Sequence, residues 1–238
     1  MRLLLLSPLL ISGCWSIPLE VQLSGTLLDS IDGQGLSGAG IEVHDALDVA
    51  AATGTTGEGG AFDITVPASQ SFFVTFNDAA GGHVPTSFTG IAGSSDVQAD
   101  EGTLYMRSAD ELALLRAEFA ACPEVDDEGP IIEGEVRLYL DVEEKDELPT
   151  VPDANVKVYD AQDNEFLACY LDDKGASLPD GTRTGATGRF AVFGVPEGPL
   201  FVEVTWALTE SVDMTSWYIV RAPAGGVVPM YPAWVEGL

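Results

Sequence analysis

The sequence predicts an all-β protein made of two tandem β-sandwiches that are joined by a short α-helix. Three observations predict this fold. Short segments alternate apolar and polar residues, as at Ile41/Val43 and Val156/Val158, which is typical of strands with one face on a core. Glycine and proline separate these segments at short intervals. The order of segments in the first half of the chain recurs in the second half.

The internal repeat defines the expected strands. The segments 21–27, 36–43, 57–67 and 72–76 recur in order and in kind as 131–136, 152–158, 185–196 and 200–204. In both copies a glycine-rich stretch precedes a phenylalanine, Phe62 or Phe190, and we expect glycines with positive φ to form a tight hairpin there. A Val-Pro pair closes the next strand in both copies, since proline lacks the donor that a ladder requires.

This order of Gly-x-Phe, Val-Pro and an aromatic strand resembles the carboxypeptidase regulatory-like family over residues 20–90 and 130–235. The resemblance implies Greek-key, transthyretin-like sandwiches of seven or eight strands, which usually act as stabilising, spacing or docking domains. The second copy departs from the pattern through an acidic insertion at 141–147. Its spacing from Val158 to Phe190 is 32 positions, against 19 from Val43 to Phe62.

A helix is expected between the two copies. Residues 108–111 read Ser-Ala-Asp-Glu, a capping box, and Leu112, Leu115 and Phe119 then fall on one face of a helix of about 13 residues that Pro123 ends. A helix of this length is only marginally stable in isolation, so its apolar stripe has to pack against another part of the protein or against a partner. It either docks on a sandwich or recruits a partner.

The N-terminus predicts the compartment. Arg2 and a short apolar run lead to Ile11-Ser12-Gly13-Cys14, which resembles the bacterial lipobox, so we expect a lipid on Cys14. An ordinary secretory signal is the alternative. Trp15 stands where an aspartate is associated with inner-membrane retention, which favours the outer membrane. The expected organisation is a signal peptide (1–13), a tether (14–19), a sandwich (20–106), a linker with the helix (107–129) and a second sandwich (130–238).

Two further cysteines remain once Cys14 carries lipid. We expect Cys122 and Cys169 to form a disulfide in an oxidising envelope, closing a loop of 48 residues. Two unpaired buried thiols are the alternative.

The charge balance excludes some partners. The 38 acidic and 10 basic residues among 238 give a net charge of −28, which excludes nucleic acid as a partner. Residues 14–106 contain twelve acids and neither lysine nor arginine, so the first sandwich should stand off anionic lipid headgroups.

The sequence predicts no catalytic residue, no cofactor and no metal ligand set. The only histidines are His44 and His83; neither is followed by a zinc-peptidase pattern, and no Gly-x-Ser-x-Gly stretch occurs. Residues 124–147 hold eleven acids and two bases, best explained as solvated linker and loop. Weak calcium binding there, or at Asp172-Asp173, is the sharper alternative, although no Asp-x-Asp-x-Asp-Gly loop occurs.

Aromatic residues leave one further function open. We expect Phe73 and Trp206 to fill cores and Tyr231 to Trp234 to cover a sheet edge. The full set of aromatic residues considered includes some that should lie outside strict core alternation. The set is Phe72, Phe73, Phe76, Trp206, Trp217, Tyr218, Tyr231 and Trp234. Exposed coplanar rings in a groove would favour glycan binding.

The predicted function is therefore that of a lipid-anchored, non-catalytic envelope protein acting as a structural, spacing or protein-docking module. The expected partners are the membrane, through the lipid, and another envelope protein or a glycan. A carbohydrate-binding surface lipoprotein and an accessory subunit of an envelope hydrolase are the alternatives.

Overall fold

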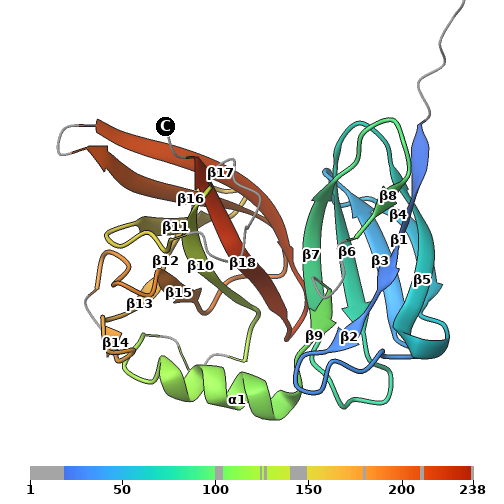
Figure 1. Cartoon of the computed structure of the whole chain (residues 1–238), viewed down its shortest axis with the longest axis horizontal. Coiled ribbons are helices and arrows are strands. Elements are labelled where there is room, and N and C mark those ends of the chain that lie inside the picture. Colours follow the sequence, from blue (N-terminus) through green and yellow to red (C-terminus); the bar gives the residue numbers. More distant parts are fainter. Residues whose placement is uncertain are drawn as a thin grey trace, which may run out of the picture.

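The structure is a computed structural model that describes residues 19–99, 104–123, 125, 128–139, 149–178, 181–209 and 212–236. Over these residues the protein is all-β, with two sandwiches side by side and one helix along the second (Figure 1). The predicted fold class is therefore confirmed. Each sandwich has its own apolar core, which contains Phe76 in the first and Phe190 in the second.

The first sandwich has one layer with the strand order β5-β1-β8 and a second with the order β4-β3-β6-β7. The strands are β1 (Glu20–Thr26), β3 (Gly40–Asp45), β4 (Ala50–Thr55), β5 (Ala61–Pro67), β6 (Ser71–Asn77), β7 (Thr86–Ile91) and β8 (Val97–Gln98). A 3₁₀ turn, η1 (Glu58–Gly60), precedes β5, and a small sheet pairs β2 (Leu28–Asp29) with β9 (Tyr105–Met106). Buried residues alternate along β3, as Ile41 and Val43, because only one face of the strand meets the core.

The second sandwich has the strand orders β14-β13-β15-β10-β18 and β12-β11-β16-β17. Its strands are β10 (Ile131–Tyr139), β11 (Asn155–Tyr159), β12 (Glu165–Leu167), β13 (Cys169–Leu171), β14 (Ser177–Leu178), β15 (Arg189–Val192), β16 (Gly198–Thr209), β17 (Val212–Ala222) and β18 (Val227–Glu236). The longer spacing before Phe190 is filled by β13 and β14, which extend the first of these layers. The acidic insertion at 141–147 lies outside the described residues.

The two sandwiches have the same strand pairing. β1 and β10 each pair antiparallel with the strand after the glycine-rich turn, β5 or β15, and parallel with the last strand, β8 or β18. β3 and β11 each lie between a hairpin partner and a longer strand, β6 or β16, which continues into β7 or β17. These pairings identify the equivalent residues of the two halves.

A buried threonine makes the same bonds in both halves. The Thr56 hydroxyl accepts the N–H of Ala39 at 3.0 Å, and the Thr184 hydroxyl accepts the N–H of Ala154 at 3.0 Å. Each hydroxyl also donates to the carbonyl oxygen of the residue three positions before that alanine. Buried backbone groups need partners, so this clamp explains why a threonine is buried at both places.

Four hairpin turns are built around an aspartate, namely Asp45, Asp78, Asp160 and Asp172. Each carboxylate accepts the backbone N–H of the residues two and four positions ahead, at 2.8 to 3.0 Å. The residue three positions ahead has a positive φ in every case, which only glycine and the short polar residues adopt readily. These four aspartates therefore stabilise hairpin turns.

The glycine-rich stretches have the expected backbone but a different role. Gly60 has a φ of +76° and Gly188 a φ of +67°, as predicted. The prediction of a hairpin was wrong at both stretches. After Gly188, β15 pairs with β13 and β10 and not with the preceding strand, β14. At Gly60, β4 pairs with β3 whereas β5 pairs with β1 in the other layer. The turn carries the chain from one sheet to the opposite one.

One sheet runs through both sandwiches. Its nine strands have the order β14-β13-β15-β10-β18-β7-β6-β3-β4, and the step from β18 to β7 crosses from the second sandwich to the first. The two strands are parallel and pair at Val227 and Thr86, where the N–H of Val227 donates to the carbonyl oxygen of Pro85 at 2.8 Å. The sheet is thus continuous, while the two cores remain separate.

The predicted helix is α1 (Ala109–Glu118), and its capping box is present: the Ser108 hydroxyl accepts the N–H of Glu111, whose carboxylate accepts the N–H of Ser108. The helix ends at Glu118, earlier than the sequence predicts. Leu115 and Phe119 are buried in a third apolar cluster with residues of the second sandwich, and the Phe119 ring packs edge-on against Phe193 at 6.0 Å. The apolar stripe therefore docks on the second sandwich.

Candidate functional site

The junction between the two sandwiches is the candidate functional site of a chain whose sequence predicts spacing or docking. Beyond the pairing of β18 with β7, side-chain hydrogen bonds of the described residues cross it at two places. The Thr89 hydroxyl donates to the carbonyl oxygen of Ile219 at 3.0 Å, and the Arg221 guanidinium donates to the Asp48 carboxylate at 2.5 Å. Asp48 lies in the turn between β3 and β4, whereas Thr89 lies on β7. Two separate segments of the first sandwich therefore contact the second one.

The junction covers the part of the outer face of the first sandwich that β6 and β7 form. Phe72 and Val74 point into the core of that sandwich, so alternation places Phe73 and Thr75 on the opposite face of β6. Both are nevertheless buried, and Thr75 shares a buried hydrogen bond with Ser87 on β7. The second sandwich provides this burial, because its contacts to Thr89 and Asp48 lie on the same face.

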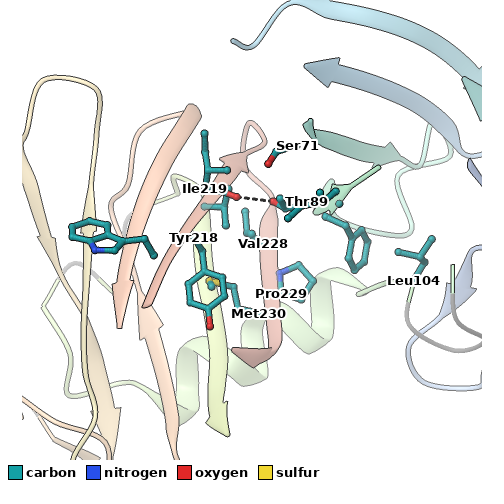
Figure 2. A pocket seen from close by; sticks show the side chains of 13 residues that line it. Ser71, Thr89, Leu104, Tyr218, Ile219, Val228, Pro229 and Met230 are labelled. Carbon is teal, nitrogen blue, oxygen red and sulfur yellow. Dashed lines mark hydrogen bonds between the residues drawn. The ribbon is translucent and has the colours of Figure 1, made fainter. Parts of the chain in front are cut away.

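A groove of about 470 Å³ opens beside the junction (Figure 2). It lies where β7 and β18 diverge from their single pair, and it is also lined by Trp217 and Ile219 of β17. The backbone N–H of Val227 points towards β7. Because the hydrogen-bonding groups of successive residues point to alternate sides of a strand, the backbone of Pro229, two residues further on, faces the same side. Proline has no N–H to offer there, which prevents a further strand from pairing along β18.

Helix α1 ties the two sandwiches together on the side away from the groove. At its first turn, Glu111 accepts the hydroxyl proton of Ser30 from the first sandwich, whose Oγ lies 2.6 and 2.7 Å from the two carboxylate oxygens. At its last turn, Glu118 pairs with Arg189 on β15 of the second sandwich. The helix is therefore held at both ends by ionic or charge-assisted bonds.

A buried ion pair fixes the segment before the helix. The Arg107 guanidinium lies 2.8 Å from the carboxylate of Glu133, whose side chain on β10 is 0% exposed. Arg107 is the first basic residue after a stretch of 93 positions, 14–106, that has none. That position was a signal that the sequence offered and that our sequence reasoning missed.

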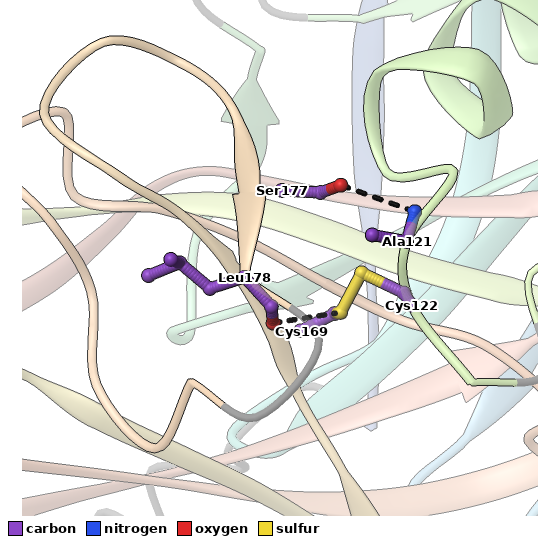
Figure 3. The surroundings of a disulfide bond; sticks show 5 residues. All are labelled: Ala121, Cys122, Cys169, Ser177 and Leu178. Atoms are coloured by element: carbon purple, nitrogen blue, oxygen red, sulfur yellow. Dashed lines mark hydrogen bonds between the residues drawn. A yellow bond between two sulfur atoms is a disulfide. The ribbon is translucent and has the colours of Figure 1, made fainter.

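The expected disulfide is confirmed. Cys122 follows α1 and Cys169 begins β13, and the two are bonded with their Cα atoms 5.9 Å apart (Figure 3). Next to them, the N–H of Ala121 donates to the hydroxyl of Ser177 at 3.1 Å. The bond therefore fastens the end of the helix to the β13–β14 insertion of the second sandwich.

His83 lies between two carboxylates near the start of the helix. Its Nε2 is 2.9 Å from Asp29 and its Nδ1 is 2.9 Å from Asp78. Burial lowers the pKa of His83, but the two hydrogen bonds outweigh burial and raise the pKa above 6.5. The hydrogen bond from His83 lowers the pKa of each aspartate. An imidazolium that donates from both nitrogens has no lone pair to act as a base, so this cluster is a structural clasp.

Tyr170 also has a structural role. Burial raises the pKa of Tyr170 to about 12. Its hydroxyl accepts the N–H of Val156 at 2.8 Å and donates to the carbonyl oxygen of the same residue at 3.1 Å. Neither this tyrosine nor His83 is arranged to attack or deprotonate a substrate.

Asp172 and Asp173, one of the two places considered for calcium, have other partners. Asp172 caps its hairpin turn, and Asp173 accepts the N–H of Ala186 at 2.8 Å. In the described part of the chain, no three histidine, cysteine or acidic side chains gather as metal ligands. Glu124, Asp126 and Asp127 lie outside that part.

The aromatic residues divide between cores, junction and surface. Phe72 and Phe76 lie in the core of the first sandwich and Trp206 in that of the second. The expectation that Phe73 fills a core was wrong, because it lies on the opposite face of β6 and is buried at the junction. Trp217 is 60% exposed on the outer face of β17. Its ring lies 6.2 Å from that of Tyr159 on β11, with the planes 33° apart. Sequence reasoning missed Tyr159, although its position on the polar side of β11, directly after the apolar Val158, was a signal.

Those two rings fall short of the arrangement that would favour glycan binding, because they are tilted and lie on an open sheet face. Tyr231 and Trp234 belong to β18, but their side chains lie outside the described ones. So does Cys14, the predicted lipidation site. Among the described helices, none is long and apolar enough to cross a bilayer.

No protein-family model and no curated protein matches this sequence. Solved structures similar to it include the Bacillus anthracis TIE protein, at 15% identity and a TM-score of 0.32, over 92% of this chain and 34% of that one. The minor pilin GBS52 of Streptococcus agalactiae has 11% identity and a TM-score of 0.31, over 91% and 96% of the two chains. The shaft pilin SpaA of Lactobacillus rhamnosus GG has 11% identity and a TM-score of 0.28, over 92% and 98%. The chain spans about a third of the TIE protein, and TM-scores this low transfer neither fold nor function.

Proposed function

We propose that this chain is a non-catalytic structural protein of the bacterial cell envelope. Its two sandwiches form one stiff spacer, held to a membrane by a lipid on Cys14, that presents the second sandwich to a protein partner. The observation that carries the proposal is the junction. Tandem domains usually move relative to one another unless the interface between them is extensive.

Three kinds of contact oppose such movement here. A shared sheet crosses the junction at Val227, the Asp48–Arg221 pair locks the neighbouring turn, and helix α1 is bonded to both sandwiches through Glu111 and Glu118. To hinge the junction, all three have to break. A spacer needs this property, because a flexible linker would not fix the position of the far end.

The charge distribution supports a position away from the membrane surface. The first sandwich follows the lipobox-like sequence and, up to residue 106, has only acidic charge. Anionic headgroups would repel it, and the second sandwich would then lie further out. Trp15 after the acylated cysteine favours the outer membrane as the site of anchoring.

Two measurements test this function. Mass spectrometry of the mature protein should find Cys14 as the acylated first residue, and a free cysteine in a longer chain would refute the anchoring. Distances between spin labels placed at exposed Ser94 and Asp163, one on each sandwich, should have a single narrow distribution. A broad distribution would refute the stiff spacer.

A further inference from the structure

The groove beside the junction contains a strand edge that no described residue pairs with. Strand β7 pairs with β6 along its whole length, but on its other side it pairs with β18 only at Thr86. The carbonyl oxygen of Pro85 accepts the N–H of Val227 and therefore points towards β18. Because the hydrogen-bonding groups of successive residues alternate in direction, those of Thr89 and Ile91 point the same way, into the groove.

These backbone groups are accessible. Among the described residues, none bonds to the backbone N–H or carbonyl oxygen of Thr89 or Ile91 on this side. Thr89 is exposed, and Ile91 is 77% exposed. β18 diverges from β7 here and has Pro229 on the facing edge, so it cannot complete the pairing itself. An unpaired strand edge is a template for the addition of another strand.

The edge of β7 lacks the features that protect other edges of this protein. Charged side chains, proline and a very short strand are common ones. β5, at an edge of the first sandwich, contains Asp63 and ends at Pro67. β12, at an edge of the second, has three residues and begins with Glu165. Residues 86–95 contain no proline, acid or base, so this edge is open to a strand from a partner.

The walls of the groove define the side chains of such a strand. Phe88 and Leu104, at the margin of the first core, lie on the core side of β7, whereas Trp217 and Ile219 lie on the other side, where Thr89 bonds to Ile219 (Figure 2). A strand added to β7 directs its side chains to these two sides in turn. Both sides are apolar, so the strand that fits is a continuous run of apolar residues.

Charge defines what lies beside that run. None of the 13 residues that line the groove is charged, although 20% of the residues of the chain are. The molecule around the groove has a net charge of −28, so it attracts basic flanking residues and repels acidic ones. The volume of about 470 Å³ is within the range of about 300–1,000 Å³ that ligand sites have.

We infer that the groove binds an extended segment of a partner protein, which pairs with the free edge of β7. The segment is a short apolar run with basic residues on both sides. In recognition of this kind, main-chain hydrogen bonds provide affinity and the side-chain pockets provide specificity. The inference rests on the proposed function, because β7 and β17 belong to different sandwiches and only a fixed junction keeps both walls in place. It states the chemistry of the protein partner.

A peptide array tests the inference on residues 15–238, which include every described strand and all three apolar clusters. Each peptide has two lysines at both ends and five central residues drawn from valine, isoleucine, leucine and phenylalanine. A subset should bind, and less tightly as salt rises, because salt screens the attraction. The same central sequences between glutamates should bind at least about tenfold more weakly. If no lysine-flanked peptide binds at about 1 mM, the inference is overturned.

Amide hydrogen exchange, followed by NMR, tests the pairing itself. A bound peptide should slow exchange at Thr89 and Ile91, and not along β4 at the edge of the same sheet. Methylation of the peptide nitrogens that face β7 should abolish binding, whereas methylation of the alternate nitrogens should have a much smaller effect. Protection of β4 in place of β7, or equal effects of the two methylation patterns, would refute the strand addition.

Variants locate the binding on β7. Thr89→Pro removes an N–H that faces the groove, and that N–H does not belong to the ladder with β6. It should weaken binding about tenfold or more, whereas Thr89→Val, which keeps the N–H, is the matched control and should bind like the unaltered chain. Trp217→Ala removes part of one wall and should also weaken binding about tenfold, which tests the site even if the proline variant does not fold. Unchanged binding by Trp217→Ala would contradict the inference.

These outcomes are separate from those of the proposed function. A chain that binds no peptide but is acylated, with a narrow label distance, would overturn the inference alone. A broad label distance would overturn the stiff spacer whatever the peptides do. If Thr89 and Ile91 are protected without peptide in a chain of doubled mass, the edge belongs to a second copy and the inference is wrong.

Discussion

Removing the disulfide should cost a large part of the stability of the protein. Cys122 and Cys169 are 47 positions apart, so their bond closes a loop of 48 residues. In the chain-entropy treatment, opening a loop of that length destabilises the folded state by about 4 kcal/mol. Domains are typically stable by about 5–15 kcal/mol, so the loss is a substantial fraction of the total.

The variant for this test is Cys122→Ala with Cys169→Ala, because alanine leaves no buried polar group in place of the two sulfurs. Its free energy of unfolding is measured by urea denaturation, followed by tryptophan fluorescence and by circular dichroism. The native contacts near the bond, such as the one from Ala121 to Ser177, should persist in the folded variant. We therefore expect a lower midpoint with an unchanged native spectrum.

Reduction of the unaltered chain is the matched control. Oxidised and reduced forms should differ by about the same 4 kcal/mol. A difference below about 1 kcal/mol in both comparisons would refute the reasoning, since it would mean that the closed loop barely restricts the unfolded chain.

Three further outcomes are expected. Because the pKa of His83 is raised, its contribution to the free energy of unfolding is complete below pH 6.5 and disappears at higher pH. The unaltered chain should therefore lose stability as the pH rises above 6.5, and His83→Gln should not show this loss. Thr184→Val should cost about 1–3 kcal/mol in urea denaturation, because a buried N–H and a buried carbonyl lose their partner. Arg221→Ala should broaden the distribution of label distances across the junction while lowering stability by about 1 kcal/mol or less, since the ion pair is partly exposed.

Each of these outcomes has a control. In the His83 cluster, Asp29 and Asp78 stabilise the folded state above pH 3.8, and this stabilisation is lost as the pH falls further. The cluster therefore stabilises the folded state most between about pH 4 and 6.5. Stability that rises from pH 6.5 to 8 would contradict the argument. Thr53→Val, at an exposed threonine, should leave the urea midpoint unchanged. A label distribution unaffected by Arg221→Ala would show that the ion pair does not restrain the junction.

The sequence predicted the parts of the fold that depend on local pattern. Alternation located β3 and β11, the capping box at Ser108 located the helix, and the count of cysteines identified the disulfide. These features depend on residues close in the chain or, for the cysteines, on elimination. The hairpin expected at the glycine-rich stretch was wrong because positive φ permits a turn without deciding which sheet the next strand joins.

The junction could not be predicted in the same way. The meeting of β18 with β7 joins strand edges about 140 positions apart and depends on a single pair, Val227 with Thr86. Arg221 and Asp48 lie in segments that have no common motif. Comparing the two repeats residue by residue would have found one clue. The pairings of β6 with β3 and of β16 with β11 make Phe201 the equivalent of Phe73, yet the two have unlike neighbours, and only Phe73 is buried.

The aspartate-capped turns have a consequence for how the molecule responds to acidification. Backbone or side-chain hydrogen bonds lower the pKa of Asp78, Asp160 and Asp172, so these carboxylates hold their charge to a lower pH than freely solvated ones. Mild acid therefore discharges the free carboxylates of the surface first. An envelope protein in an acidifying medium would shed much of its mutual repulsion while its hairpins stayed intact, and neighbouring molecules could then approach without unfolding.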